Sequence, residues 1–170
     1  FNREVDLNTA NLLREEAKSG IKIEAIIAPS FTSEALKQLS RVKTRRILAT
    51  GELTHGESTL QIRNITDGVL VQSRDSHDLS RIDLQMVTSR NPTEDEMRSL
   101  LFSWKACKHV KSNAILLAQG TKTVGIGAGQ MSRVDSSIIA VRKAGDHAKG
   151  SVLASDAFFP FPDGVETAGK

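Results

Sequence analysis

The chain has 170 residues, of which 39% are hydrophobic and 25% are charged, and it carries a formal net charge of +3. This length corresponds to about one domain, at roughly 100–200 residues each. The composition is that of an ordinary globular protein, which excludes wholesale disorder, collagen and coiled coil. A single cysteine, Cys107, excludes an internal disulfide framework and a cysteine-rich zinc site.

The composition also limits the partners of the chain. Its longest apolar runs have the length of strands, so no membrane-spanning helix is expected, and no basic-then-apolar signal segment opens the chain. The net charge is too small to indicate a nucleic-acid surface, and aromatic residues make up only 4%. We therefore expect a cytoplasmic protein that binds neither nucleic acid nor a membrane.

Helix and strand patterns alternate in the first part of the chain. Asp6 is typical of a helix cap, and the apolar spacing predicts a helix from there to Lys18. A short helix is predicted from Thr32 or Ser33 to Leu39. Four segments have the apolar pattern of strands: residues 21–28, 45–50, 60–65 and 68–72. This alternation predicts an α/β fold with a mostly parallel sheet.

The most polar stretch, residues 73–90, indicates a subdomain boundary, because loops of that length are uncommon inside compact domains. One strand is expected within it, at residues 84–87. Thr93 and Glu96 then match a capping box, which begins the strongest helix pattern of the chain. Five side chains at helical spacing form its predicted inward face: Met97, Leu100, Leu101, Trp104 and Cys107.

The last part of the chain alternates in the same way. Strands are predicted at residues 114–118, 123–126 and 152–154. A helix is predicted between the second and third of these strands, over residues 131–144, and three of its side chains are expected to face inward: Val134, Ile138 and Val141.

A glycine-rich turn is predicted before that helix, at Gly125, Gly127 and Gly129. Glycines at this place would let the backbone approach an anionic ligand at the helix N-terminus. A dinucleotide-binding fingerprint needs a glycine at its sixth place, where Gln130 stands. A nicotinamide-dependent oxidoreductase and a tight turn without a ligand both stay open from these residues alone.

Three of the six phenylalanines lie within four residues, at Phe158, Phe159 and Phe161, beside two prolines. Prolines stiffen such a segment and keep it out of a central strand. The segment could form a rigid aromatic wall for a flat heterocycle, or its phenylalanines could simply fill the core.

Several basic residues follow one another at the end of the strongest helix, where cations complement the helix dipole: Lys105, Lys108, His109 and Lys111. Asn113, at the junction of this helix with a strand, is a more informative polar group, because an amide can donate and accept hydrogen bonds at once. The other histidines have no metal-ligand spacing, so no metal is expected.

Three motifs follow in a fixed order: Lys111-Ser-Asn113-Ala-Ile, Thr123-Val-Gly-Ile-Gly-Ala-Gly-Gln-Met-Ser-Arg133-Val-Asp and Ser155-Asp-Ala-Phe-Phe-Pro-Phe-Pro-Asp163-Gly. Together with Phe1-Asn-Arg-Glu-Val-Asp and Glu24-Ala-Ile-Ile-Ala-Pro, they resemble the AICAR formyltransferase part of the bifunctional purine biosynthesis protein. That protein joins AICAR formyltransferase to IMP cyclohydrolase, and the resemblance spans nearly the whole chain.

The resemblance implies transfer of a formyl group from 10-formyltetrahydrofolate to the 5-amino group of AICAR, which gives FAICAR in de novo purine (IMP) biosynthesis. It implies an α/β, cytidine deaminase-like fold with αβα layers, a mixed sheet and two related subdomains, and an active site at a homodimer interface. Matched residue by residue, it implies AICAR contacts at Glu24, Asn113, Arg133 and Phe158, and folate contacts at Val134 and Asp163.

The departures from the family pattern are equally informative. The family's Lys-His-x-x-Pro-type catalytic motif is absent, and Lys108 and His109 align elsewhere, so no catalytic residue is assigned. The cyclohydrolase domain, the Arg-Tyr substrate motif and the C-terminal segment of the folate pocket are also absent. We therefore expect an internal piece of the enzyme that is inactive by itself.

In this interpretation the first formyltransferase subdomain ends with residues 1–75, and the second, which is truncated, begins with residues 93–170. Residues 76–92 are the segment that connects the two subdomains. A non-catalytic nucleotide-binding module remains an alternative, and a nicotinamide-dependent oxidoreductase a weaker one. The sequence also leaves open whether a monovalent cation lies near Asp156.

Overall fold

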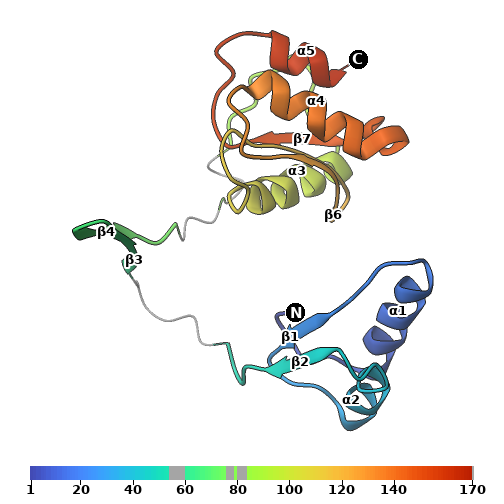
Figure 1. Ribbon diagram of the computed structural model, residues 1–170. Coiled ribbons are helices and arrows are strands. Elements are labelled where there is room, and N and C mark those ends of the chain that lie inside the picture. The colour runs from blue at the N-terminus through green and yellow to red at the C-terminus, as the bar shows by residue number, and fades with distance from the viewer. Residues whose placement is uncertain (54–59, 76–78, 80–83, 170) are drawn as a thin grey trace. The chain divides into compact units, whose positions relative to one another are not determined.

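The computed structural model describes residues 1–53, 60–75, 79 and 84–169 (Figure 1). The chain divides into two compact units, residues 1–75 and 76–170, and each is described by itself. Both contain helices and strands, which confirms the α/β class. No helix among these residues is both long and apolar enough to span a membrane.

The first unit is a small α/β layer. Its helices are α1 (Leu7–Lys18) and α2 (Ser33–Leu39), and its parallel strands are β1 (Ala25–Ala28) and β2 (Arg46–Ala49). The predicted caps are confirmed, since Asp6 accepts from the Thr9 amide and Thr32 accepts from the Ala35 amide. The first predicted strand, residues 21–28, is shorter than expected and begins only at Ala25.

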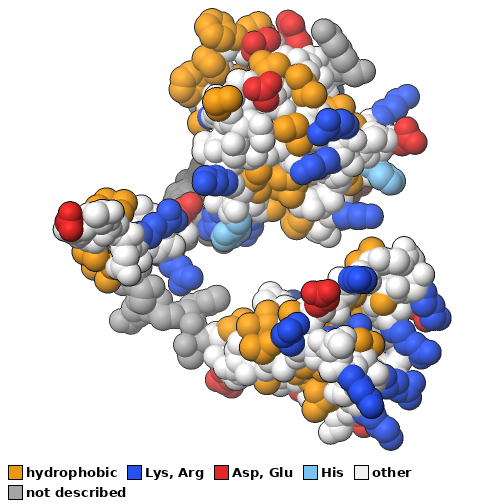
Figure 2. All heavy atoms as spheres, viewed as in Figure 1, with side chains coloured by type: hydrophobic (Ala, Val, Ile, Leu, Met, Phe, Trp, Pro, Cys, Tyr) orange, Lys and Arg blue, Asp and Glu red, His pale blue; other side chains and the backbone are white. Residues whose placement is uncertain are grey.

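The predicted pair of strands after this layer is also present. An antiparallel hairpin is formed by β3 (Leu60–Ile65) and β4 (Gly68–Ser73), with Asp67 at a positive φ of 63° in the turn. Every residue of the two strands is exposed, including Ile62 and its partner Val71, so apolar side chains lie on the surface here (Figure 2).

The second unit has three layers. Its sheet has the order β6-β5-β7, formed by β5 (Ile115–Gln119), β6 (Lys122–Gly127) and β7 (Val152–Ser155). Helix α3 (Glu94–Cys107) covers one face and α4 (Arg133–Ala144) covers the other, and α5 (Asp163–Gly169) packs against α4 (Figure 1). A 3-10 turn, Gly145–Ala148, follows α4.

The central strand β5 belongs to the core on both faces. Leu116 packs in a cluster with Cys107 of α3, and Leu117 packs in a cluster with Ala140 of α4. All strand pairs in this sheet are antiparallel, so the expectation of a mostly parallel sheet is wrong here and holds only for β1 and β2. A short hairpin, with Gly120 at a φ of 58° in its turn, joins β5 to β6. Strand β7 pairs with β5 only after the intervening β6 and α4.

The capping box of α3 is confirmed, but its predicted inward face is not the most buried one. The buried stripe consists of Ser99, Ser103 and Cys107, whereas Met97 and Trp104 are only half-buried. Small side chains let the helix approach the sheet closely, and the larger ones lie beside this contact. The strand expected at residues 84–87 is absent, since that segment has no regular structure.

Helix α4 departs from prediction for a related reason. Val141 packs against the core as predicted and Val134 is half-buried, but Ile138 is 48% exposed rather than inward. The buried residues of the helix are Ser136, Ser137, Ala140 and Ala144. Gly125 and Gly127 lie within β6 rather than in a turn, and a Cβ on either would overlap the backbone of α4, at Ala140 or Ser136. Glycine here permits close packing of helix on strand. Gly129, with a φ of 68°, is the glycine that makes the turn.

Candidate functional site

The ion pair between Arg133 and Asp156 lies at the centre of the candidate site. Arg133, the first residue of α4, donates from a terminal guanidinium nitrogen to Oδ1 of Asp156 at 2.8 Å. The side chains are only 13% and 18% exposed. Arg133 Nε also donates to the carbonyl oxygen of Phe158 at 2.9 Å. The guanidinium therefore connects the start of α4 to the segment after β7.

Asn113 is held beside this pair. Its side-chain nitrogen donates to the Gln130 carbonyl at 2.9 Å, and its own carbonyl accepts from Ser136 Oγ at 2.7 Å. The next amide, that of Ala114, donates to Asp156 Oδ1 at 3.0 Å. Asn113, Arg133 and Phe158 are thus brought together through Asp156, and Asn113 would contact a ligand through Oδ1 or its second N–H.

The Asp156 carboxylate is held in its ionised form. Partial burial raises its pKa, but hydrogen bonds from the Ser112 side chain and the Ala114 amide, together with the charge of Arg133, lower it further, so the net pKa lies below the ordinary value. The described residues contain no group of three or more histidine, cysteine or acidic side chains that could hold a metal ion.

The phenylalanines of the 155–164 segment do not form one wall. Phe158 is 80% exposed and Phe161 is 68% exposed, whereas Phe159 packs against the core beneath α4. The core-filling interpretation therefore holds for Phe159, and an exposed aromatic face is available at Phe158. Apolar side chains gather on the surface over this segment and α5 (Figure 2).

The two residues matched to folate contacts lie at the same end of the unit. Val134 follows Arg133 in the first turn of α4 and is half-buried. Asp163 is the first residue of α5, and its Oδ1 accepts from the Gly164 amide at 2.8 Å. Gly164 packs on Phe159, and a Cβ on it would lie 3.9 Å from Cβ of Arg133. The first turns of α4 and α5 are therefore neighbours.

Glu24 belongs to the first unit, which is described by itself. It lines a polar cavity of about 590 Å³ together with Lys43, Thr44, Arg45 and Arg46. The Arg45 guanidinium there donates to the carbonyls of Ile23 and Leu39, which gives it a structural role. Glu24 therefore adds a carboxylate to a basic surface of its own unit.

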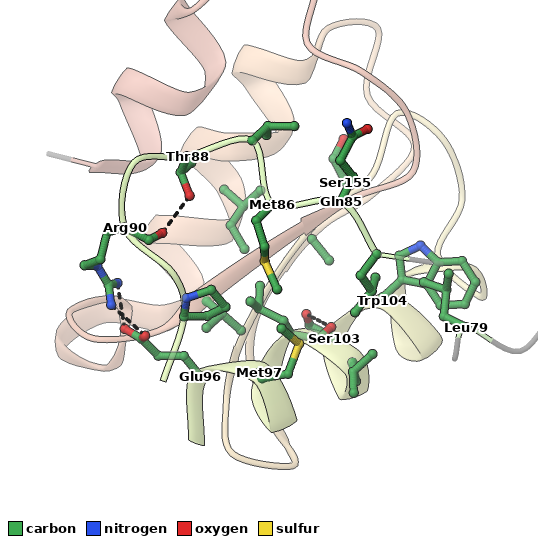
Figure 3. Close-up of a pocket in the computed structure, with 18 of the residues that line it drawn as sticks. Leu79, Gln85, Met86, Thr88, Arg90, Glu96, Met97, Ser103, Trp104 and Ser155 are labelled. Carbon is green, nitrogen blue, oxygen red and sulfur yellow. Dashed lines mark hydrogen bonds and ion pairs between the residues drawn. The ribbon is translucent and has the colours of Figure 1, made fainter. Parts of the chain in front are cut away.

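The second unit also has an apolar cavity of about 560 Å³, between residues 84–92, α3 and β7 (Figure 3). Met86 and Met97 point toward each other across it, and the Arg90–Glu96 ion pair lies at one end. None of the six predicted ligand contacts lines this cavity, and the half-buried apolar face of α3 does. Residues 84–92 therefore cover an apolar side of α3 next to the strand β7.

Comparison with known proteins decides the family. The family described as AICARFT/IMPCHase bienzyme matches residues 1–143, which is most of the chain. The chain belongs to this family.

Relatives of the AICARFT/IMPCHase family match along the whole chain. The bifunctional purine biosynthesis protein PurH of Oceanobacillus iheyensis is 46% identical over 169 residues, which are 99% of this chain and 32% of that protein. PurH of Bacillus subtilis is 47% identical over 170 residues, covering 100% of this chain and 32% of that protein. PurH of Nostoc is 47% identical over 168 residues, with 99% and 32% covered. The chain thus spans about a third of the length of these relatives.

Two features of the AICARFT/IMPCHase chain were missed or misread in the sequence. Asp156 lies within a family motif, but its pairing with Arg133 has no local signal, since the two residues are 23 positions apart and only the fold brings them together. A turn is predicted at Gly125 and Gly127, with or without a ligand, whereas both glycines lie in β6 and are covered by α4. A strand glycine covered by a helix is not placed to cradle a pyrophosphate, so the oxidoreductase alternative loses its supporting motif.

Proposed function

We propose that this chain is part of an AICAR formyltransferase, which transfers the formyl group of 10-formyltetrahydrofolate to the 5-amino group of AICAR in purine biosynthesis. The observation that supports this most is the clustering of Asn113, Arg133 and Phe158 through Asp156, in a chain that belongs to the AICARFT/IMPCHase family. The residues matched to AICAR and folate contacts in this unit then line one end of α4 and α5.

The chemistry of formyl transfer fits the side-chain types at the candidate site. The AICAR amine is a weak nucleophile, and its attack on the formyl carbon forms a C–N bond and a tetrahedral oxyanion. The bond to folate N10 then breaks, the amine proton passes to an acceptor, and N10 takes up a proton. Phe158 would stack on the imidazole ring, and Asn113 would orient a polar group of AICAR. Asp163 would accept hydrogen bonds from the pterin, beside Val134.

We assign no catalytic residue to this chain. Lys108 is the C-cap of α3 and His109 follows it, and the next residues, Val110-Lys111-Ser112, do not complete a Lys-His-x-x-Pro-type motif. The proton acceptor and the cation at the oxyanion would then come from other parts of the full-length enzyme, and Glu24 would contact AICAR from the first unit.

The finer architecture belongs to the same proposal. Residues 1–75 would end the first formyltransferase subdomain and residues 93–170 would begin the second, with 76–92 between them, in a cytidine deaminase-like fold. The three layers of the second unit and the division of the chain after Asp75 support this. Exposed apolar side chains near the site, such as Met131 at 97% and Phe158 at 80%, support a homodimer that covers them. The enzyme would be cytoplasmic.

Three measurements test this function: formation of FAICAR, binding of AICAR and oxidation of NADH. The longest natural polypeptide that contains these 170 residues is incubated with AICAR and 10-formyltetrahydrofolate, and FAICAR is measured; the isolated chain is the matched comparison. We expect FAICAR from the long polypeptide, none from the isolated chain, and no oxidation of NADH by either. AICAR binding without FAICAR would favour the non-catalytic module, and absence of both would refute the nucleotide site.

A further inference from the structure

The Asp156 carboxylate connects three segments that are distant in sequence. Its Oδ1 atom accepts from the Ala114 amide at 3.0 Å and from Arg133 at 2.8 Å. Arg133 in turn donates to the carbonyl of Phe158 at 2.9 Å. Asp156 Oδ1 thus holds Ala114 and Arg133 directly, and it holds Phe158 through Arg133.

The same contacts restrict what Arg133 can do. A guanidinium binds an anion most strongly through two parallel N–H groups on one edge. Nε of Arg133 is used by the Phe158 carbonyl and one terminal nitrogen is used by Asp156, and the Asp156 charge offsets that of Arg133. The contacts of Arg133 therefore suit it to orient the segment at Phe158. They suit it less to bind an anionic ligand, because Asp156 already offsets its charge.

We propose that Asp156 is a positioning residue of the AICAR site, which acts through Arg133 to hold Phe158 in place relative to Asn113. The proposal rests on the proposed function and adds to it a residue that touches no ligand. Loss of the carboxylate charge would release the guanidinium from Asp156 and, with it, the carbonyl of Phe158. Asn113 would keep its own bonds to Gln130 and Ser136.

The test is a double-mutant cycle in the longest natural polypeptide that contains this chain. Asp156→Asn removes the charge and keeps the shape, and Arg133→Met removes the guanidinium and keeps an apolar stem. Asp95→Asn is the matched control, because Asp95 also pairs with an arginine, Arg98 at 3.4 Å, on the exposed face of α3. The KM for AICAR and kcat of formyl transfer are measured for each, with circular dichroism to follow folding.

We expect Asp156→Asn and Arg133→Met each to raise the KM for AICAR about tenfold or more, the size of one lost hydrogen bond to a charged group. The double variant is expected to stay within about twofold of the worse single variant, because both remove the same coupling. The kcat is expected to change little, since the interaction serves binding. Asp95→Asn is expected to leave both constants unchanged.

Other outcomes would overturn the inference. An unchanged KM for Asp156→Asn, or effects of the two single variants that multiply in the double variant, would show that Asp156 does not act through Arg133. If Asp156→Asn does not fold, Asp156→Glu replaces it, and recovery of the wild-type KM to within about threefold is expected because the charge is kept. Absence of turnover in the wild-type protein would refute the proposed function instead, which separates the two failures.

Discussion

Gly127 of β6 lies directly against the backbone of Ser136 in α4, so closely that a Cβ would overlap the Ser136 carbonyl. This contact sets the distance between helix and sheet at the end of the unit where Asn113 and Arg133 lie. The hydroxyl of the same residue, Ser136 Oγ, donates to the Asn113 carbonyl at 2.7 Å. The geometry of the site therefore depends on the absence of a side chain at position 127.

Replacement of Gly127 by alanine is expected to be strongly destabilising. The added methyl group meets backbone atoms, which cannot rotate away, so the cost should reach about 3 kcal/mol in the free energy of unfolding of the second unit. Gly68→Ala is the control, since its Cβ would meet only the Ile65 side chain at 3.8 Å. Chemical unfolding followed by circular dichroism measures both, and equal stabilities for the two variants would contradict the close packing.

Replacement of two neighbouring serines of α4 by alanine is expected to change the free energy of unfolding in opposite directions. Both are fully buried, but Ser136 Oγ has a partner and Ser137 Oγ has none among the described residues. Ser136→Ala should lower the free energy of unfolding by about 1 kcal/mol, because the Asn113 carbonyl loses its donor. Ser137→Ala should raise it by about 1 kcal/mol, because a buried unpaired hydroxyl is removed. A destabilised Ser137→Ala would mean that this hydroxyl has a partner.

The thiol of Cys107 is expected to be unreactive in the native protein. It is 2% exposed beneath β5, and burial raises its pKa, so the thiolate is scarce at neutral pH. Titration with a thiol-specific chromogenic reagent should show one thiol reacting rapidly in denaturant and slowly without it. Equally fast modification in both conditions would show that α3 does not cover the thiol as described.

The first turn of α3 is expected to lose stability at acid pH. Hydrogen bonds from Arg90 and the Thr93 amide lower the pKa of Glu96 from 4.5 to about 2. Because the folded-state pKa is depressed, the stabilisation is fully present above pH 4.5 and is lost as the pH falls toward about 2. Glu96→Gln should flatten the dependence of unfolding on pH in this window, and an unchanged profile would contradict the assigned interaction.

Local signals predicted the local structure well. Asp6, Thr32 and Thr93 cap their helices as expected, because a cap depends on side chains within a few residues. The inward faces of α3 and α4 were predicted only in part: Cys107 and Val141 pack in the core as expected. The other buried residues are selected by small size rather than by hydropathy, because helix and sheet approach closely there. Ser103 and Ser136 are fully buried for that reason, and Ile138 is exposed.

The site was predicted through its motifs, and its connections were not. Asn113, Arg133 and Phe158 were named from residue-by-residue resemblance, and the structure brings them together. The link through Asp156 joins residues that are 23 and 42 positions apart, which no spacing rule detects. The relation of Glu24 to these residues stays a prediction.

Calorimetric titration of AICAR tests the central claim most directly. The longest natural polypeptide that contains this chain is compared with its Asn113→Ala and Phe158→Ala variants, and Phe161→Ala is the control because Phe161 is an exposed phenylalanine of the same segment. We expect Asn113→Ala and Phe158→Ala each to weaken AICAR binding about tenfold or more, through a lost hydrogen bond and a lost stacking face. Phe161→Ala should bind as the wild type does. Unchanged affinity in both Asn113→Ala and Phe158→Ala would contradict a shared AICAR site at this end of the sheet.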